Sequence, residues 1–253
     1  MSDLSRLEPE MPRDQREGPD MRETPPAFNL PGVIVLLGAV MIAIHGVRTG
    51  LLPQAADFNV LERFAFVPGF YDAPAEALRY PMARFWTPMS HAFLHGDWTH
   101  LLVNLVWMAA FGGVVAARFG AFRFLIFFAV GSAAGALAHY FSARGDLVPL
   151  IGASGAVSAC MGAAIRFAFG DGRMAMRPEQ RSSAPAMGLV ASLANRNIMI
   201  FVGVWFLLNW LLGSGILPIA GGDSIAWQAH VGGFALGWLG FAIFDPLWRD
   251  RVR

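Results

Sequence analysis

Residues 149–169 read PLIGASGAVSACMGAAIRFAF, a predominantly apolar run with one arginine near its end. About 20 mostly apolar residues are enough for a helix to cross a bilayer, so this run is long enough to be a spanning helix. Many of its residues are Gly, Ala or Ser, and small residues let helices in a membrane pack closely. The run predicts a spanning helix in close contact with its neighbours, with Ser154 near its start.

Five other runs have the same apolar character. They lie at 31–50, 98–117, 122–141, 198–217 and 226–244. Of all residues, 55% are hydrophobic and 15% are charged, well below the roughly 25% charge of an average soluble domain. We therefore expect an all-α membrane protein with six spanning helices. The formal net charge of +1 provides no basic surface for nucleic acid.

The segments outside the spans differ in character. The connection 51–97 is too long for a tight turn and contains several prolines, so we expect an outer loop with structure of its own. Residues 1–28 mix both charge signs with proline and lack the apolar stretch of a signal peptide, which predicts a flexible cytoplasmic tail. The expected membrane domain is 29–246, followed by a short cytoplasmic tail at 247–253.

The arginines indicate the orientation of the helices. An even number of spans places both termini on one side, and segments rich in Arg or Lys stay in the cytoplasm. With cytoplasmic termini, 14 of the 19 cationic residues, all of them Arg, fall on the inner side. The five on the outer side are Arg48, Arg63, Arg79, Arg84 and Arg144. Both termini are therefore expected in the cytoplasm.

Four polar side chains within the predicted spans are functional candidates: His100, Asn104, Ser154 and His230. Unpaired polar groups are costly in hydrocarbon, although for any one of them alone a structural hydrogen bond between helices is the more common role. Asn104, Ser154 and His230 each follow an outer acidic residue by seven or eight positions, roughly 10–12 Å if those stretches are helical. Equal depth favours one polar cavity that opens outward.

Ser154 is framed by Gly152 and Gly155 where a helix is expected to begin. Free backbone N–H groups and the positive end of the helix dipole favour a developing oxyanion at such a place. The two glycines would let another backbone approach closely. This setting suits acyl transfer with Ser154 as the nucleophile, although the same short motif is also typical of tight helix packing.

His230 is followed by a pair of small residues four apart, Gly233 and Gly237, which predicts a close helix contact just below the histidine. If the partner is the helix of Ser154, His230 could remove the proton from the serine hydroxyl as a general base. No carboxylate is expected at this depth to orient the imidazole. The sequence therefore predicts a Ser–His dyad and not a triad.

His100 and Asn104 are four residues apart and share one helix face. In the dyad scheme these two side chains and the backbone N–H of Ser154 donate to the oxyanion. His91, His95 and His100 could instead bind a metal, but no Cys or acidic cluster completes such a site. We expect chemistry without metal or cofactor, and His95 is expected to brace the loop.

Three motifs, at 95–104, 152–155 and 229–237, follow one another in this order on alternate predicted helices. Together they resemble the rhomboid family of intramembrane proteases, and the resemblance covers about 80–246. It implies a six-helix bundle in the cell membrane, the inner membrane of a bacterium, that cleaves single-pass membrane proteins near the outer end of their transmembrane helix. It also implies Ser154 as nucleophile and His230 as base.

The sequence departs from the family pattern at two places. Many members have a Trp-Arg pair in the long first loop, where this chain reads Arg84-Phe85-Trp86-Thr87. Many also have an aromatic residue four positions after the nucleophile, against the catalytic histidine, where this chain has Ser158. Two other functions stay open: a proteolytically silent relative that binds transmembrane clients, and a polytopic transporter with a polar cavity.

Overall fold

The computed structural model describes residues 30–169, 178–214, 216 and 226–247. The tails predicted at 1–28 and, apart from Leu247, at 247–253 lie outside these residues. The described chain is helical, with an isolated antiparallel bridge between Phe66 and Leu150. The elements, in order, are α1 (Gly32–Gly50), α2 (Gln54–Phe64), α3 (Pro68–Asp72), η2 (Ala75–Ala77), η3 (Pro81–Phe85), α4 (Thr87–Ser90), η4 (His91–Phe93), α5 (Trp98–Trp107), the π-helical turn η5 (Met108–Gly112), α6 (Gly113–Phe119), α7 (Ala121–Ser142), α8 (Ser154–Ala164), α9 (Pro178–Ser183), α10 (Leu189–Ala194), α11 (Arg196–Gly213) and α12 (Trp227–Phe244).

Four helices in the described part of the chain are long and apolar enough to cross a membrane. They are α1, the continuous stretch from α5 to α6, α7 and α11. These helices match four of the six predicted spans, with ends that differ by a few residues. A fifth predicted span corresponds to α12, an 18-residue helix that is not among those four; it contains no charged residue but has Gln228 and His230 in its first turn.

The sixth predicted span, at 149–169, is wrong at both ends, because α8 covers only Ser154–Ala164. Gly152 has φ 115°, a left-handed conformation that favours glycine. A helix that approaches α8 from the N-terminal side therefore cannot continue through this residue. The stretch between Asp146 and Ser154 is therefore not helical. The depth predicted for Ser154 assumed a helix there, so that count does not hold.

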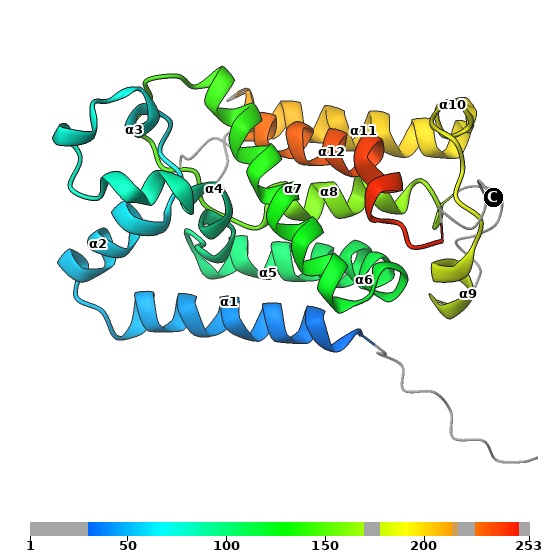
Figure 1. Ribbon diagram of the computed structural model, residues 1–253, viewed down its shortest axis with the longest axis horizontal. Coiled ribbons are helices and arrows are strands. Elements are labelled where there is room, and N and C mark those ends of the chain that lie inside the picture. The colour runs from blue at the N-terminus through cyan, green and yellow to red at the C-terminus, as the bar shows by residue number, and fades with distance from the viewer. Residues whose placement is uncertain (1–29, 170–177, 215, 217–225, 248–253) are drawn as a thin grey trace, which may run out of the picture.

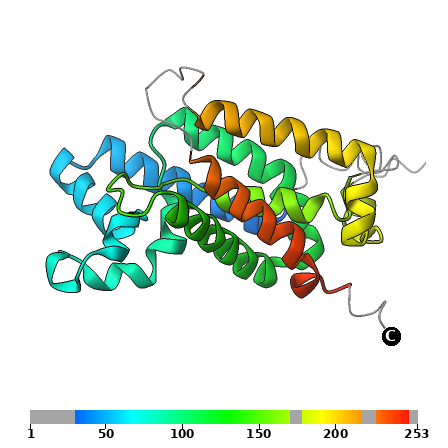
Figure 2. The same cartoon turned by 90° about the horizontal axis from the view of Figure 1, so that it is seen from above.

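Helix α8 lies among α5, α7 and α12 in both views of the molecule (Figures 1 and 2). All of its residues after Ser154 are buried. Their small side chains let other backbones come close: a Cβ added to Gly135 of α7 would lie 3.2 Å from Gly155 Cα, and one added to Gly162 would overlap the Phe234 carbonyl of α12. The core of the fold is thus α8, a helix whose small side chains let neighbouring helices pack closely on several sides.

The two ends of the bundle carry different structures. Helices α2, α3 and α4 lie at one end, and α9 and α10 lie at the other (Figure 1). Helix α1 begins, and α12 ends, at the end that carries α9 and α10 (Figures 1 and 2). The start of α1 and the end of α12 thus lie at the same end of the bundle, and the side of a membrane that this end faces stays a prediction.

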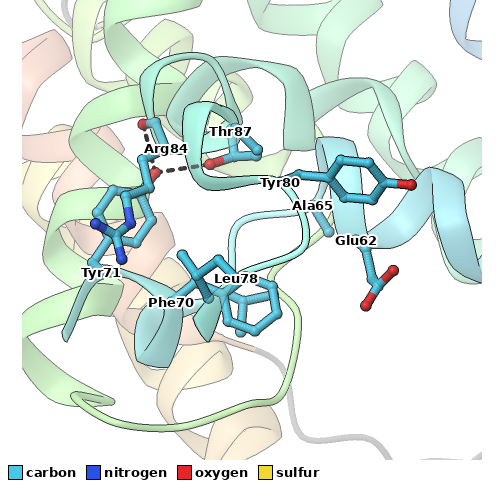
Figure 3. Close-up of a pocket in the computed structure, with 10 residues that line it drawn as sticks. Glu62, Ala65, Phe70, Tyr71, Leu78, Tyr80, Arg84 and Thr87 are labelled. Atoms are coloured by element: carbon cyan, nitrogen blue, oxygen red, sulfur yellow. Dashed lines mark hydrogen bonds between the residues drawn. The ribbon is translucent and has the colours of Figure 1, made fainter. Parts of the chain in front are cut away.

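The loop 51–97 is folded and fastened by hydrogen bonds. The Tyr71 hydroxyl donates to the Arg84 carbonyl (2.9 Å) and shares a hydrogen bond with the Thr87 hydroxyl (2.8 Å), as Figure 3 shows. The Arg84 guanidinium donates to the Ala73 carbonyl, and the Trp86 indole N–H donates to the Arg63 carbonyl (2.7 Å). Arg84 and Trp86 therefore anchor the loop from the place where many family members have Trp-Arg.

A buried ion pair joins the end of α6 to the end of α12. Arg118 Nε and Nη2 donate to the two carboxylate oxygens of Asp245, each at 2.9 Å, and the two side chains are 1% and 0% exposed. Arg118 Nη1 also donates to the carbonyls of Ser182 (3.0 Å) and Ala184 (2.7 Å). One guanidinium thus connects three segments that are far apart in the sequence.

Replacing Asp245 by Asn is expected to lower the free energy of unfolding by about 3–5 kcal/mol, because a buried guanidinium would lose its charged partner. Thermal unfolding in detergent would measure the loss. The control is Asp72→Asn, since the Asp72–Arg144 pair (2.9 Å) lies at the surface and should contribute far less. Equal losses in the two variants would contradict this account of the buried pair.

Candidate active site

The start of α8 presents backbone donors next to Ser154. The residue before the helix, Ala153, has no side chain that could accept from the first N–H groups of the helix. The Gly152 N–H donates to the His91 carbonyl (3.0 Å), which fixes the turn that leads into the helix. Ser154 itself is half-buried, in contrast to the ten buried residues that follow it in α8. Its hydroxyl is therefore placed at an accessible helix N-terminus.

Helix α5 brings His100 and Asn104 to this turn. The Asp97 carboxylate accepts from the His100 backbone N–H (2.9 Å) and caps the helix, which fixes where its first turn begins. A Cβ added to Gly152 would lie 2.6 Å from His100 Nε2 and 3.9 Å from Asn104 Nδ2. Gly152 is thus needed to leave room for the His100 ring. The neighbour is a side chain, whereas the sequence analysis expected a backbone to approach this glycine.

The Asn104 amide is oriented by its own helix. Its Nδ2 donates one proton to the His100 carbonyl (2.9 Å), and an amide nitrogen carries two. The second N–H is left for another acceptor. His100 and Asn104 therefore bring a ring nitrogen and an amide nitrogen to the turn just before Ser154.

Helix α12 places His230 beside the start of α8. A Cβ added to Gly135 of α7 would lie 2.9 Å from the Ala229 carbonyl oxygen and 3.2 Å from Gly155 Cα, so the immediate neighbours of His230 and Ser154 meet at one point. A Cβ on Gly233 would overlap the Gly155 carbonyl. His230 and Gly233 are three residues apart and share a helix face. The histidine therefore stands on the face of α12 that packs against α8.

Gly237 continues this contact one turn deeper, since a Cβ there would overlap the Ala159 carbonyl of α8. No hydrogen bond joins Ser154 to His230, two residues that the structure describes. Hydrogen bonds of catalytic groups often form only when substrate is bound, so the separation of the two side chains is compatible with a dyad.

Asn209, one turn before the end of α11, was missed by the sequence analysis. Its Oδ1 is hydrogen-bonded to His230 Nδ1, while its Nδ2 donates to the Trp205 carbonyl (2.8 Å). One signal could have found it, since an amide inside an apolar span is a functional candidate on the same grounds as Asn104. Trp205 stacks on Phe234 of α12 with ring centroids 4.8 Å apart, next to this hydrogen bond.

Ser158 is buried on α8, one turn deeper than Ser154. It stands where many family members have an aromatic residue against the catalytic histidine. In this chain the hydrogen bond from the His230 ring goes to Asn209, on a different helix.

His91 and His95 lie outside the membrane-spanning helices and are structural. Burial lowers the pKa of His91 to about 4 and the pKa of His95 to about 3. Both rings are therefore neutral at physiological pH. Arg48 Nη1 donates to the His95 carbonyl (3.1 Å), and Arg48 Nε donates to Asp57 Oδ1 (2.6 Å), which ties this turn to α1 and α2. The described residues contain no group of three His, Cys, Asp or Glu that could hold a metal.

The sequence profile of the Rhomboid domain matches residues 82–245, a range that includes all four candidate side chains and Asn209. The chain belongs to the rhomboid family. Rhomboid protease GlpG from two strains of Klebsiella pneumoniae is 31% identical over 164 residues. That match covers 64% of this chain and 49% of each GlpG, so the chain spans about half the length of these relatives. The rhomboid domain and the long apolar helices together identify a membrane protein.

Proposed function

We propose that this rhomboid is an intramembrane serine endopeptidase that acts through a dyad of Ser154 and His230. The observation that carries the proposal is the contact between α8 and α12. Gly155, which follows Ser154, and Gly233, three residues after His230, allow the backbones of these helices to touch. This contact holds a hydroxyl and an imidazole on facing elements beside the donors of α5. The proposed dyad has no carboxylate partner for the imidazole, as in the sequence-based prediction.

In the proposed reaction the Ser154 Oγ attacks the carbonyl carbon of the scissile peptide bond, and its proton passes to His230 Nε2. The tetrahedral intermediate then collapses as the C–N bond breaks, and the same proton is transferred to the leaving amine. A water molecule hydrolyses the acyl-enzyme with His230 again as base. No metal, nucleotide or other cofactor takes part.

The oxyanion of each tetrahedral intermediate is proposed to accept from His100 Nε2, Asn104 Nδ2 and the Ser154 backbone N–H. The convergence of the first two at Gly152 supports this role. The uncapped N-terminus of α8 adds backbone donors and a positive dipole end at the same place. Preorganised donors of this kind act where negative charge develops.

The proposed substrate is the transmembrane segment of a single-pass membrane protein, cut near its outer end. We place both termini in the cytoplasm of a bacterium, with the loop 51–97 outside the inner membrane. The substrate helix is proposed to approach laterally beside α11, because Ile198 is the one buried residue of that helix. A weakly covered helix is the element that can move aside at least cost.

Replacing His100 or Asn104 by Ala is expected to lower kcat by about 10²–10³-fold, with a smaller change in KM, because each side chain donates mainly to the transition state. Initial rates of cleavage over a range of substrate densities in vesicles would give both constants. The matched control is Thr99→Ala, which changes an exposed side chain on the first turn of α5, next to His100. Unchanged kcat in both His100→Ala and Asn104→Ala would contradict the oxyanion role.

Reconstitution in vesicles tests the function itself. Purified protein is incubated with several single-pass proteins, and the products are mapped by mass spectrometry. Cleavage near the outer end of the substrate helix is the expected result. A wild-type protein that binds these substrates without cutting any of them would favour a silent, client-binding relative. Solute flux without cleavage would favour a transporter.

A further inference from the structure

The His230 ring has a polar partner on α11, the helix least covered by the rest of the bundle. Asn209 Oδ1 is hydrogen-bonded to His230 Nδ1. Among the hydrogen bonds of the described residues, this is the one that the His230 ring makes. The contact joins α11 to α12 close to the stacked Trp205 and Phe234 rings.

The second hydrogen bond of Asn209 decides the direction of the first. Asn209 Nδ2 donates to the Trp205 carbonyl (2.8 Å), so the amide nitrogen is turned toward its own helix. The amide oxygen, which can only accept, therefore faces His230. Its partner Nδ1 must carry the proton. In the neutral ring Nε2 then has the lone pair and is the acceptor.

We propose that Asn209 is a positioning residue that holds His230 in the tautomer and orientation in which Nε2 can accept the Ser154 proton. The inference rests on the proposed dyad for its catalytic consequence, but the tautomer is a property of the resting protein. An amide fixes the ring as a carboxylate would, without a formal charge. His100 is the titratable group that interacts electrostatically with His230 in the described structure.

The hydrogen bond also links the orientation of the His230 ring to the position of α11 against α12. Leu207 and Leu208 precede Asn209 and are each 51% exposed, so this part of α11 has its apolar side chains turned away from the bundle. Asn209 and Trp205, four residues apart, form the face that meets α12. A displacement of α11 would break the bond to His230 Nδ1 and free the ring to rotate.

Three variants of the full chain test the role: Asn209→Ala, Asn209→Asp and the matched control Leu208→Ala. Asn209→Ala is expected to lower kcat by about 10- to 100-fold through misorientation of the base, with little change in KM. Asn209→Asp keeps an acceptor for Nδ1 and should retain most of the activity. Its carboxylate favours the imidazolium, so the acidic limb of its pH–activity profile should move to higher pH. Leu208→Ala should match wild type in both respects.

Two results would overturn the proposal. The first is unchanged kcat in Asn209→Ala. The second is an equal loss in the Ala and Asp variants that follows their thermal stabilities, since a merely structural residue would give that pattern.

A readout without catalysis separates this inference from the proposed function. In protein labelled with ¹⁵N-histidine, with His230→Ala used to assign the signal, His230 should be protonated at Nδ1 in wild type. This preference should weaken in Asn209→Ala. Protonation at Nε2 in wild type would overturn the inference even if the enzyme cleaves its substrates. Failure of Ser154→Ala to abolish cleavage would instead overturn the dyad and leave the tautomer result standing.

Discussion

Replacing Ser154 by Ala is expected to lower kcat for a single-pass membrane substrate by at least about 10⁴-fold, because no other group can form the acyl intermediate. His230→Ala should have an effect of the same size. The double variant should lose no more than either single one, since nucleophile and base act as a unit. Single-turnover cleavage in vesicles, with enzyme in excess, would measure all three.

Ser158→Ala is the matched control for this prediction. This change also removes a serine hydroxyl from α8, but at a position one turn deeper and away from the proposed oxyanion donors. Activity close to that of wild type is expected. Loss of cleavage in Ser158→Ala together with its retention in Ser154→Ala would contradict the assignment of the nucleophile.

Replacing Gly233 by Ala is the second change with a large expected effect. The added Cβ would overlap the Gly155 carbonyl, so α8 and α12 must separate. Overpacking of this kind costs about 1–3 kcal/mol of stability. A shift of about 1 Å between nucleophile and base can lower kcat about 100-fold. Thermal unfolding and kcat, measured on the same preparation, would show both losses.

Gly240→Ala is the control for Gly233→Ala on the same helix. A Cβ there would meet only the Leu236 side chain of its own helix, at the ordinary contact distance of 3.7 Å. The change should leave kcat unaltered, and the higher helix propensity of Ala favours a small gain in stability. If Gly233→Ala also kept full activity, the distance between α8 and α12 would not control catalysis, contrary to this account.

Much of the fold could be predicted because hydrophobic length alone identifies long spanning helices. The spans at 31–50 and 122–141 match α1 and α7 to within a residue at each end. A close helix contact at Gly233 and Gly237 was predictable, since closely spaced small residues are typical of helix contacts in membranes, but the sequence did not identify α8 as the partner. The short length of α8 was not predictable, because the apolar run continues on both sides of the helix and the break before it depends on the backbone conformation of Gly152.

Pairings between distant residues could not be predicted. Arg118 and Asp245 are 127 positions apart. In the sequence, each resembles an ordinary charged residue at the end of a helix, and nothing near it indicates the partner. The sequence analysis counted Arg118 and Arg166 among the arginines on the cytoplasmic side, and it did not predict that both side chains are buried in the protein. Asn209 was visible as a polar residue in an apolar span. Its partner, however, depends on how α11 and α12 face each other, and a single sequence does not state that.

Labelling with a fluorophosphonate tests the central claim most directly, because the probe reacts with a serine activated by a base and needs no knowledge of the substrate. The intact protein in detergent is treated with the probe, digested, and mapped by mass spectrometry. We expect modification of Ser154 in wild type and none in Ser154→Ala or His230→Ala, with Ser158→Ala labelled like wild type. Labelling that persists in Ser154→Ala, or modification of a different residue in wild type, would contradict the Ser154–His230 dyad.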